Sequence, residues 1–297
     1  MTLYDEIGRN NRMTAVLFIL YSLFYGAVVF AALILLGIMP SLPTFTIATF
    51  ALLVLFYFIS FSQGPNLIMG VMGAKEVQKK EYPYLYNSVD SLSIGAGIPM
   101  PKVFVIESDA LNAFATGPDP KHAAIAVTSG LLKKLNRAEL EGVLAHEMSH
   151  IRNFDIRTAM VAAVLAMAVA LLADISLRML RTRDGGERRG GSSAVFLIAL
   201  VFMILAPFIS LLIRLAISRN REYAADASGA MLTRYPEGLA SALGKIEKYY
   251  EAEHRDMPGI NDATRHFFIF DPMKKSFLTL FSTHPPIEER IKRLQAM

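Results

Sequence analysis

The chain lacks cysteine altogether, and charged residues are few for its length. Without cysteine it can form no disulfide framework, no catalytic thiol and no thiolate metal site, so any metal must bind to His, Asp or Glu. Charged residues make up only 19% of the 297 residues, and hydrophobic residues make up 53%. Because soluble chains contain about 25% charged residues, this composition disfavours an ordinary cytosolic enzyme and favours a membrane protein.

Long basic tracts are also missing, although the net charge is +4. The lysines and arginines are scattered or stand beside apolar segments, a pattern that suits the headgroups of a lipid bilayer better than nucleic acid. We therefore expect the lipid bilayer as a partner of this chain and expect no nucleic acid.

The N-terminal segment, residues 1–74, is predicted to be a transmembrane hairpin. The 62 residues from Met13 to Ala74 include no charged residue and no histidine. As one helix they would extend about 93 Å, some three times a hydrocarbon core of about 30 Å, so the run must fold back. Pro40 and Pro43 mark the break, which gives two spanning helices over 13–38 and 43–62. A cleaved signal peptide is excluded because its apolar core would be only about 7 to 15 residues long.

A second pair of apolar segments, within residues 158–217, is predicted to form another membrane hairpin. Its second segment, 194–213, is long enough to span a bilayer. Its first segment, 158–173, makes only about 24 Å of helix, so spanning would place Asp174 near an interface or require local thinning of the bilayer. A buried helical hairpin in a soluble domain is the competing interpretation.

The remaining residues, 75–157 and 218–297, are predicted to be the two halves of one α+β domain that the second hairpin separates. Leu85, Val89 and Leu92 have helical spacing and precede a cluster of glycine and proline. Short strand patterns follow at 102–106, 113–116 and 123–128. Their lengths and their turn-like flanks indicate a small sheet beside a helix.

The strongest chemical pattern lies on a predicted helix over residues 135–154. Asn136 is its expected N-cap, with Glu139 three residues later in a capping-box arrangement. The helix carries the sequence HEMSH at 146–150. The composition of the chain predicts about 0.006 occurrences of this pattern by chance, so it is a strong signal.

The spacing within this pattern predicts a metal site. Residues four apart lie on one face of a helix, so the imidazoles of His146 and His150 can bind the same ion. Glu147 stands beside them without being needed as a ligand. A metalloprotease requires this arrangement, because zinc lowers the pKa of its bound water to about 7 and the glutamate takes the proton as that water attacks a carbonyl.

A catalytic zinc needs three protein ligands and one open position, and here the third ligand must be His, Asp or Glu. Glu222 is the candidate because it follows the last apolar segment, where a helix leaving the membrane would carry it. Asp226, one turn further, could accept the second ring N–H of a ligating histidine. Alternatively, both carboxylates pair with Arg219 or Arg221 on a solvated helix face.

Taken together, these features resemble the HtpX family of membrane zinc metallopeptidases, relatives of the CAAX prenyl proteases, over nearly the whole chain. The matching segments are the N-terminal apolar hairpin and residues 112–117, 146–155, 222–226 and 283–286. The resemblance implies a gluzincin-like zinc metallopeptidase domain with two transmembrane helical hairpins and one Zn²⁺ per chain. Its implied ligands are His146, His150 and Glu222, with Glu147 as the catalytic base. The implied role is an endopeptidase of protein quality control whose substrates are membrane or misfolded proteins.

Two further segments carry weaker expectations. Asn112, Ala113, Phe114 and Ala115 resemble the strand beside the family's cleft, where an extended substrate could add through main-chain hydrogen bonds, although an ordinary core strand explains them equally well. His284 could reach the cleft and stabilise an oxyanion, or it could simply belong to a helix start before two prolines.

Zinc chemistry also constrains the topology. His150 and Glu222 must meet at one ion with bonds of about 2 Å. The chain must therefore enter the second hairpin near Arg157 and return from it near Ser218 on the same side of the membrane. Arg9, Arg12 and the lysines after residue 74 predict that the catalytic domain faces the cytoplasm from a multi-pass position in the plasma membrane. The loop after the third apolar segment is then outside although it is rich in arginine. Either the first hairpin dominates or the second does not fully span; we predict spanning.

Other functions remain as alternatives. A CAAX prenyl protease-like processing peptidase is less favoured because those relatives have more membrane spans than this chain has apolar segments. A non-catalytic scaffold stabilised by zinc would need a closed four-ligand site, for which the sequence offers no convincing fourth ligand. A transport path with a zinc-binding regulatory domain is disfavoured because the first hairpin has no ionisable group.

Overall fold

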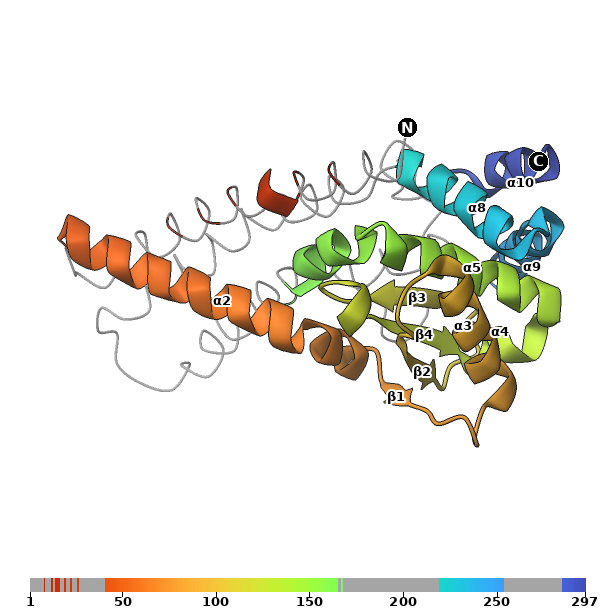
Figure 1. The fold of residues 1–297 in the computed structure, drawn as a ribbon, viewed down its shortest axis with the longest axis horizontal. Helices are drawn as coiled ribbons and strands as arrows, with labels where there is room; N and C mark the ends of the chain where they lie inside the picture. The colour runs from red at the N-terminus through yellow and green to blue at the C-terminus, as the bar shows by residue number, and fades with distance from the viewer. Residues whose placement is uncertain are drawn as a thin grey trace, which may run out of the picture.

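The computed structural model of the protein describes residues 41–164, 219–253 and 285–297, with residue 167 and isolated positions between 8 and 26. Its first labelled helix, α2 (Leu42–Val71), projects away from the rest of the described chain (Figure 1). Ser41 caps this helix, and Pro43 lies in the first turn, where its missing N–H is not needed. The predicted partner helix over 13–38 lies outside the described residues except for isolated positions.

Helix α2 has the length and composition of a membrane span. Its most apolar window has a mean hydropathy of 2.1, and none of that window is buried inside the protein. Ile47 and Phe50, for example, are 71% and 68% exposed. Within the described ranges it is the one helix long and apolar enough to cross a bilayer. The two predicted hairpins are thus represented by a single candidate span.

The helix does not end near residue 62 as the sequence predicts. It continues through Pro65 to Val71, and Gly73, with a positive φ of 66°, follows its end. Ile68 and Met69 in these extra turns are only 1% and 2% exposed and pack against the sheet described next. The added turns are therefore stabilised by burial in the protein, which hydropathy alone does not reveal.

Four strands form one mixed sheet in the order β1-β2-β4-β3. β2 (Lys102–Ile106) runs parallel to β4 (Ala124–Thr128), and β3 (Ala113–Thr116) pairs antiparallel with β4 at one edge. These are the three predicted strands. The sequence does not reveal β1 (Ala74–Glu76), which pairs antiparallel with β2, because it is short and two of its residues are charged.

Both faces of the sheet are covered. Val103 and Ile125 on one face pack against α3 (Pro83–Ala96) and α5 (Arg137–Arg152). Phe104 and Phe114 on the other face pack against the end of α2 and the helical residues 155–164. Two short elements lie beside the sheet, the 3₁₀ turn Pro120–His122 and α4 (Ser129–Lys134). The sheet is thus held between α2 and the helix that carries the predicted metal motif.

Helix α5 begins as the sequence predicts. The Asn136 side chain accepts a hydrogen bond from the Glu139 amide (3.0 Å), and the Glu139 carboxylate accepts one from the Asn136 amide (2.8 Å). Glu139 also accepts hydrogen bonds from Ser241 and Lys245 of α9 (Pro236–Glu253). The start of α5 is therefore tied to the second half of the chain.

Helix α8 (Arg219–Thr233) and α9 lie close against α5 because glycines stand at the contacts (Figure 1). A Cβ atom on Gly142 of α5 would lie 2.6 Å from the Leu239 nitrogen, and one on Gly229 of α8 would lie 3.0 Å from the His146 nitrogen. A larger residue at Gly142 would force the helices apart, and one at Gly229 would require the backbone of α5 to move by a few tenths of an ångström. The last helix, α10 (Ile287–Gln295), packs on α8 and α9.

The predicted second membrane hairpin is described only at its start. Residues 155–164 are helical, and Met160 and Val161 are buried against α2 and the sheet. Gly64 of α2 permits this approach, since a Cβ atom there would lie 2.9 Å from the Met160 sulfur. The first turns of the third apolar segment thus lie inside the protein. The rest of 158–217 lies outside the described residues apart from residue 167.

Candidate metal centre

The two motif histidines lie side by side on α5. Their ring centroids are 4.7 Å apart with the rings nearly perpendicular, at 89°. The Nε2 atoms of His146 and His150 are only 3.2 Å apart. Both rings are shielded from solvent, since their side chains are 2% and 15% exposed. The helical spacing thus aims both Nε2 atoms at one point, as the sequence predicts.

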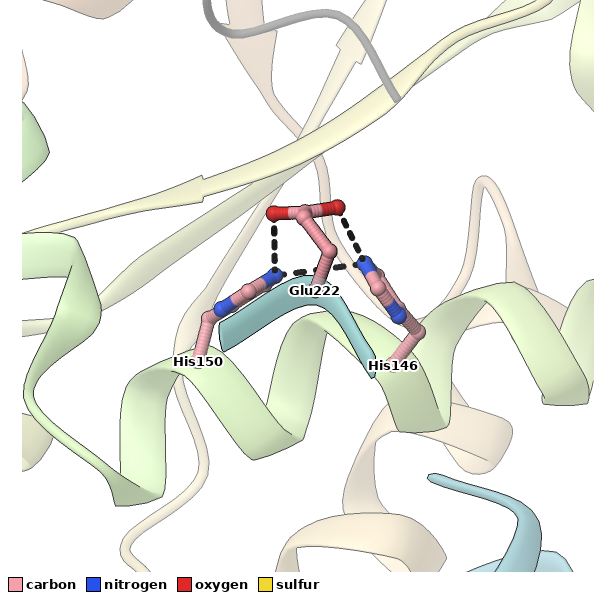
Figure 2. Close-up of side chains that lie close together, drawn as sticks. All are labelled: His146, His150 and Glu222. Atoms are coloured by element: carbon pink, nitrogen blue, oxygen red, sulfur yellow. Dashed lines mark hydrogen bonds and ion pairs between the residues drawn. The ribbon is translucent and has the colours of Figure 1, made fainter. Parts of the chain in front are cut away.

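Glu222 of α8 completes a group of three donors over this point (Figure 2). One carboxylate oxygen lies 3.7 Å from Nε2 of His146, and the other lies 3.6 Å from Nε2 of His150. One ligand atom from each residue lies within 4.8 Å of the others. The alternative that Glu222 and Asp226 lie on a solvated face is wrong, because they are 4% and 2% exposed.

The donor set fits a tetrahedral metal ion. Ligand atoms about 2.0 to 2.2 Å from such an ion lie roughly 3.3 to 3.6 Å from one another, which is close to the observed separations. Neutral imidazoles that present two lone pairs to each other at 3.2 Å beside a carboxylate need a cation or a proton between them. Two imidazoles and one carboxylate are ligands that zinc accepts.

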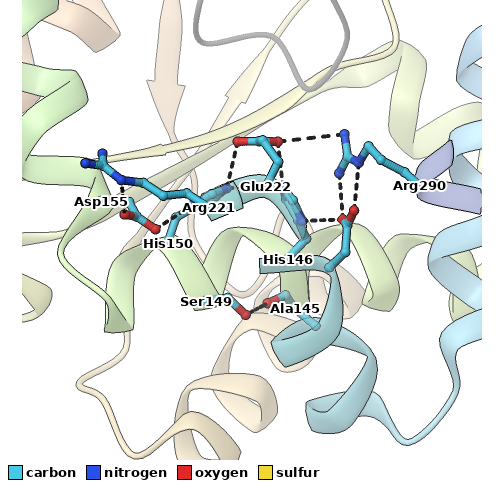
Figure 3. Close-up of polar contacts among 9 residues, drawn as sticks. Ala145, His146, Ser149, His150, Asp155, Arg221, Glu222 and Arg290 are labelled. Atoms are coloured by element: carbon cyan, nitrogen blue, oxygen red, sulfur yellow. Dashed lines mark hydrogen bonds and ion pairs between the residues drawn. The ribbon is translucent and has the colours of Figure 1, made fainter. Parts of the chain in front are cut away.

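A carboxylate and an arginine stand behind His146. Nδ1 of His146 lies 3.0 Å from Oδ1 of Asp226, although the ring is not turned for a straight hydrogen bond. Asp226 in turn accepts hydrogen bonds from Nε and Nη2 of Arg290, at 2.8 and 2.7 Å (Figure 3). Asp226 therefore lies where the sequence predicts a tautomer-fixing carboxylate, whereas Arg290, on the remote helix α10, was not among the predicted site residues.

His150 has a second carboxylate and arginine behind it, and neither was among the predicted site residues. Its Nδ1–H donates to Oδ2 of Asp155 (3.0 Å), and Nε of Arg221 lies 3.6 Å from Oδ1 of the same carboxylate (Figure 3). Asp155 follows the end of α5, so helical periodicity could not assign it to the histidine face. Its proximity to the motif and its place at the end of the matching segment 146–155 were the available signals.

Charge and burial set the protonation of these groups. Burial raises the pKa of Asp226, but the positive charge of Arg290 and its hydrogen bonds outweigh burial and lower that pKa to about 2. Burial lowers the pKa of His150, but the Asp155 hydrogen bond and the Glu222 charge outweigh burial and raise that pKa to about 9. The site therefore attracts positive charge, as a metal-binding site must.

Glu147 lies between the histidines in sequence and is 5% exposed. Burial raises its pKa to about 7, and the negative charge of Glu222 adds to this rise. A positive charge on His150 and a hydrogen bond from the Ala115 backbone oppose the rise. A carboxyl group with a pKa near neutrality is suited to accept a proton and to return it.

The remaining predicted positions are not among the three candidate metal ligands. Ala113, Phe114 and Ala115 belong to the edge strand β3, and Asn112 immediately precedes it; all four are buried. The β3 backbone approaches Glu147 through Ala115. His284 lies outside the described residues.

Comparison with known proteins supports the chemistry of this site. The model of peptidase family M48 matches residues 79–297. A "Protease HtpX homolog" of Dictyoglomus thermophilum is 44% identical, and the match covers 100% of this chain and 95% of that protein. One from Tropheryma whipplei is 48% identical over 78% of each chain.

A solved structure shares the fold. The crystal structure of S. mikatae Ste24p matches with a TM-score of 0.52 and 20% sequence identity, over 97% of this chain. This chain spans only 66% of the Ste24p chain. The family match and the sequence relatives do not favour a scaffold or a prenyl protease-like peptidase over the main prediction. The chain belongs to peptidase family M48, and it is a membrane-bound metalloprotease.

Proposed function

We propose that this protein is a zinc endopeptidase that binds one Zn²⁺ through His146, His150 and Glu222. The observation that carries the proposal is the convergence of these three donors from α5 and α8, at separations close to the edges of a zinc tetrahedron. The group contains three donors within the described chain, which leaves the fourth position for water and substrate.

The chain's own groups supply the proton transfers. When bound, Zn²⁺ would lower the pKa of its water to about 7 and polarise the carbonyl of the scissile peptide bond. The Glu147 carboxylate takes a proton from the attacking water and gives it to the leaving amine nitrogen. Burial of Glu147 favours both steps because its pKa of about 7 lets it accept and release the proton near neutral pH.

The histidines are held for this role from behind. Asp155 accepts a hydrogen bond from Nδ1–H of His150, and Oδ1 of Asp226 lies 3.0 Å from Nδ1 of His146. With a metal bound, a proton on each Nδ1, facing these carboxylates, would leave Nε2 as the unprotonated nitrogen at the metal position. The carboxylates thereby choose the tautomer that can bind a cation.

The proposed substrates are membrane or misfolded proteins, within a role in protein quality control. The resemblance to the HtpX family supports this role, and the direct packing of α2 under the sheet supports a catalytic domain that sits at the bilayer. We further propose two membrane hairpins, with the catalytic domain on the cytoplasmic side of the plasma membrane. The arginines and lysines that flank the first hairpin support this orientation.

The Glu147→Gln variant tests the reaction. It keeps the size of the side chain but removes the proton acceptor, so we expect zinc content to be unchanged and cleavage of a membrane-protein substrate to be lost. Glu141→Gln, on the same helix and outside the site, is the matched control and should cleave normally. Retained cleavage by Glu147→Gln would refute Glu147 as the base, and a wild-type protein without metal would refute the zinc centre.

A further inference from the structure

We propose that Asp155 and Arg221 are positioning residues for the metal centre, which together hold His150 and join the two chain segments that flank residues 158–217. The inference rests on the proposed metal site. It goes beyond the ligand set, because neither residue touches the metal position and neither belongs to the Asp226–Arg290 pair.

The Asp155 carboxylate is divided between two partners. Oδ2 accepts the hydrogen bond from Nδ1 of His150 at 3.0 Å, and Oδ1 lies 3.6 Å from Nε of Arg221. Asp155 and Arg221 are 9% and 5% exposed, so water does not compete strongly for either contact. Because the arginine engages one oxygen, it limits rotation of the carboxylate and keeps the other oxygen on the ring.

Several contacts hold the turn that delivers Asp155. Phe154 adopts a positive φ of 61°, which is unfavourable for a residue with a side chain, and its amide donates to the Ile151 carbonyl at 3.2 Å. Its ring lies under the guanidinium of Arg157, 4.8 Å from the ring centre. Arg157 also donates to the Pro118 carbonyl. These contacts hold an unfavourable backbone conformation that turns the chain back, so that Asp155 meets His150.

Arg221 reaches the same place from the other half of the chain. Arg221 and Glu222 are adjacent and both lie on the buried side of α8. Ala225 and Asp226 continue this side one turn later. One turn of α8 therefore contributes a donor to the metal site and a cation to the carboxylate behind it. A displacement of α8 relative to α5 would disturb His150 and Glu222 together.

The pair also lies where the inserted segment begins and ends. Asp155 stands three residues before residue 158, and Arg221 stands four residues after residue 217. Their ion pair thus joins the two parts of the chain that flank this segment, next to a candidate metal ligand.

Metal titration of the purified full-length protein in detergent tests the inference. We expect Asp155→Asn to weaken Zn²⁺ binding by about 10- to 100-fold, the usual effect of losing such a partner. Arg221→Met should weaken it less, and Arg221→Lys should stay nearer to wild type. If Arg221 acts through Asp155, the double variant should lose no more affinity than Asp155→Asn alone.

A second readout separates positioning from general damage. Replacement of zinc by Co²⁺ should give the variants a visible spectrum altered from that of the wild type, because the His150 ring is less constrained. Glu139→Gln is the matched control: it removes a buried carboxylate from the far end of α5 and should lower thermal stability without changing metal affinity or the cobalt spectrum.

The outcomes are distinct. Equal Zn²⁺ affinity in wild type, Asp155→Asn and Arg221→Met would overturn the inference and leave the zinc centre standing. Additive losses in the double variant would overturn the claim that Arg221 acts through Asp155. A wild type that binds no Zn²⁺ would overturn the proposed function and this inference with it. Should Asp155→Asn fail to fold, the contrast between Arg221→Lys and Arg221→Met decides the question.

Discussion

The guanidinium of Arg290 makes two hydrogen bonds with the carboxylate of Asp226, at 2.8 and 2.7 Å, and thereby joins the last helix of the chain to the candidate metal centre. Arg290 is 0% exposed, and its Nη1 also lies 3.8 Å from Glu222. A charge buried this completely is tolerated because two carboxylates surround it. Helix α10 is therefore part of the site's construction.

Substitution of Arg290 should be strongly destabilising. Arg290→Met leaves the buried Asp226 carboxylate without its charged partner, and removal of one partner of such a pair costs about 3 to 5 kcal/mol. Thermal or denaturant unfolding in detergent measures this loss. Lys292→Met, which removes an exposed charge from the same helix, is the control and should change stability by less than about 0.5 kcal/mol. Equal effects of the two substitutions would contradict the buried pair.

Gly229 should contribute to metal binding. A Cβ atom there would meet the backbone of Ala145 and His146, so Gly229→Ala should push α8 from α5, cost about 1 to 3 kcal/mol and weaken Zn²⁺ binding by separating Glu222 from the histidines. Gly244→Ala on α9 is the control, because a Cβ atom there would make only an ordinary contact at 3.8 Å. It should stabilise the protein by up to about 1 kcal/mol through helix propensity. Normal zinc affinity in Gly229→Ala would show that the spacing of α5 and α8 is unimportant.

The Glu139 cluster predicts a pH-dependent contribution to stability. Burial raises the pKa of Glu139, but hydrogen bonds from Lys245, Ser241 and the Asn136 amide outweigh burial and hold it below its ordinary value of 4.5. A group whose pKa is lower in the folded state stabilises the fold above its unfolded pKa, and this stabilisation is lost as pH falls through its folded pKa. The destabilisation of Glu139→Gln should thus be about 1.5 to 3 kcal/mol at pH 7 and should shrink below about pH 4. Unfolding of both proteins across this range measures it, and a difference that does not change with pH would contradict the prediction.

The topology of the second hairpin can be tested by chemical labelling. Because the chain has no cysteine, Ser192→Cys introduces a unique thiol between the third and fourth apolar segments. If both segments span, a membrane-impermeant thiol reagent should label it in intact cells. Lys133→Cys, on the exposed side of α4 in the catalytic domain, should be labelled only after permeabilisation. Labelling of Ser192→Cys only after permeabilisation would show that the second hairpin does not cross.

Short-range patterns in the sequence predicted much of the fold. The limits of β2 and β3 and the capping box of Asn136 follow from short-range alternation and spacing, and the structure has them where they are predicted. The predicted end of α2 was wrong because the extra turns are stabilised by contacts of Ile68 and Met69 with strands far along the chain. Hydropathy along the chain does not contain such contacts.

In the candidate site, too, local spacing was predictable and long-range contacts were not. His146 and His150 could be paired from their spacing, and Glu222 could be selected because zinc needs a third ligand and the residue follows an apolar segment. Asp155 and Arg290 could not, because one follows a turn with unusual backbone geometry and the other arrives from a separate helix. Residues that contact the metal ligands from behind come from distant parts of the chain, so a pattern along the sequence identifies them poorly.

Because α2 runs as one helix from its exposed outer turns to the residues beneath the sheet, it fixes the position of the sheet relative to those outer turns. One residue inserted near Gly64 would turn Ile68 and Met69 by about 100° around the axis relative to the outer turns. If α2 spans the bilayer as proposed, its length therefore determines how far a polypeptide must extend from the lipid to reach the candidate metal centre.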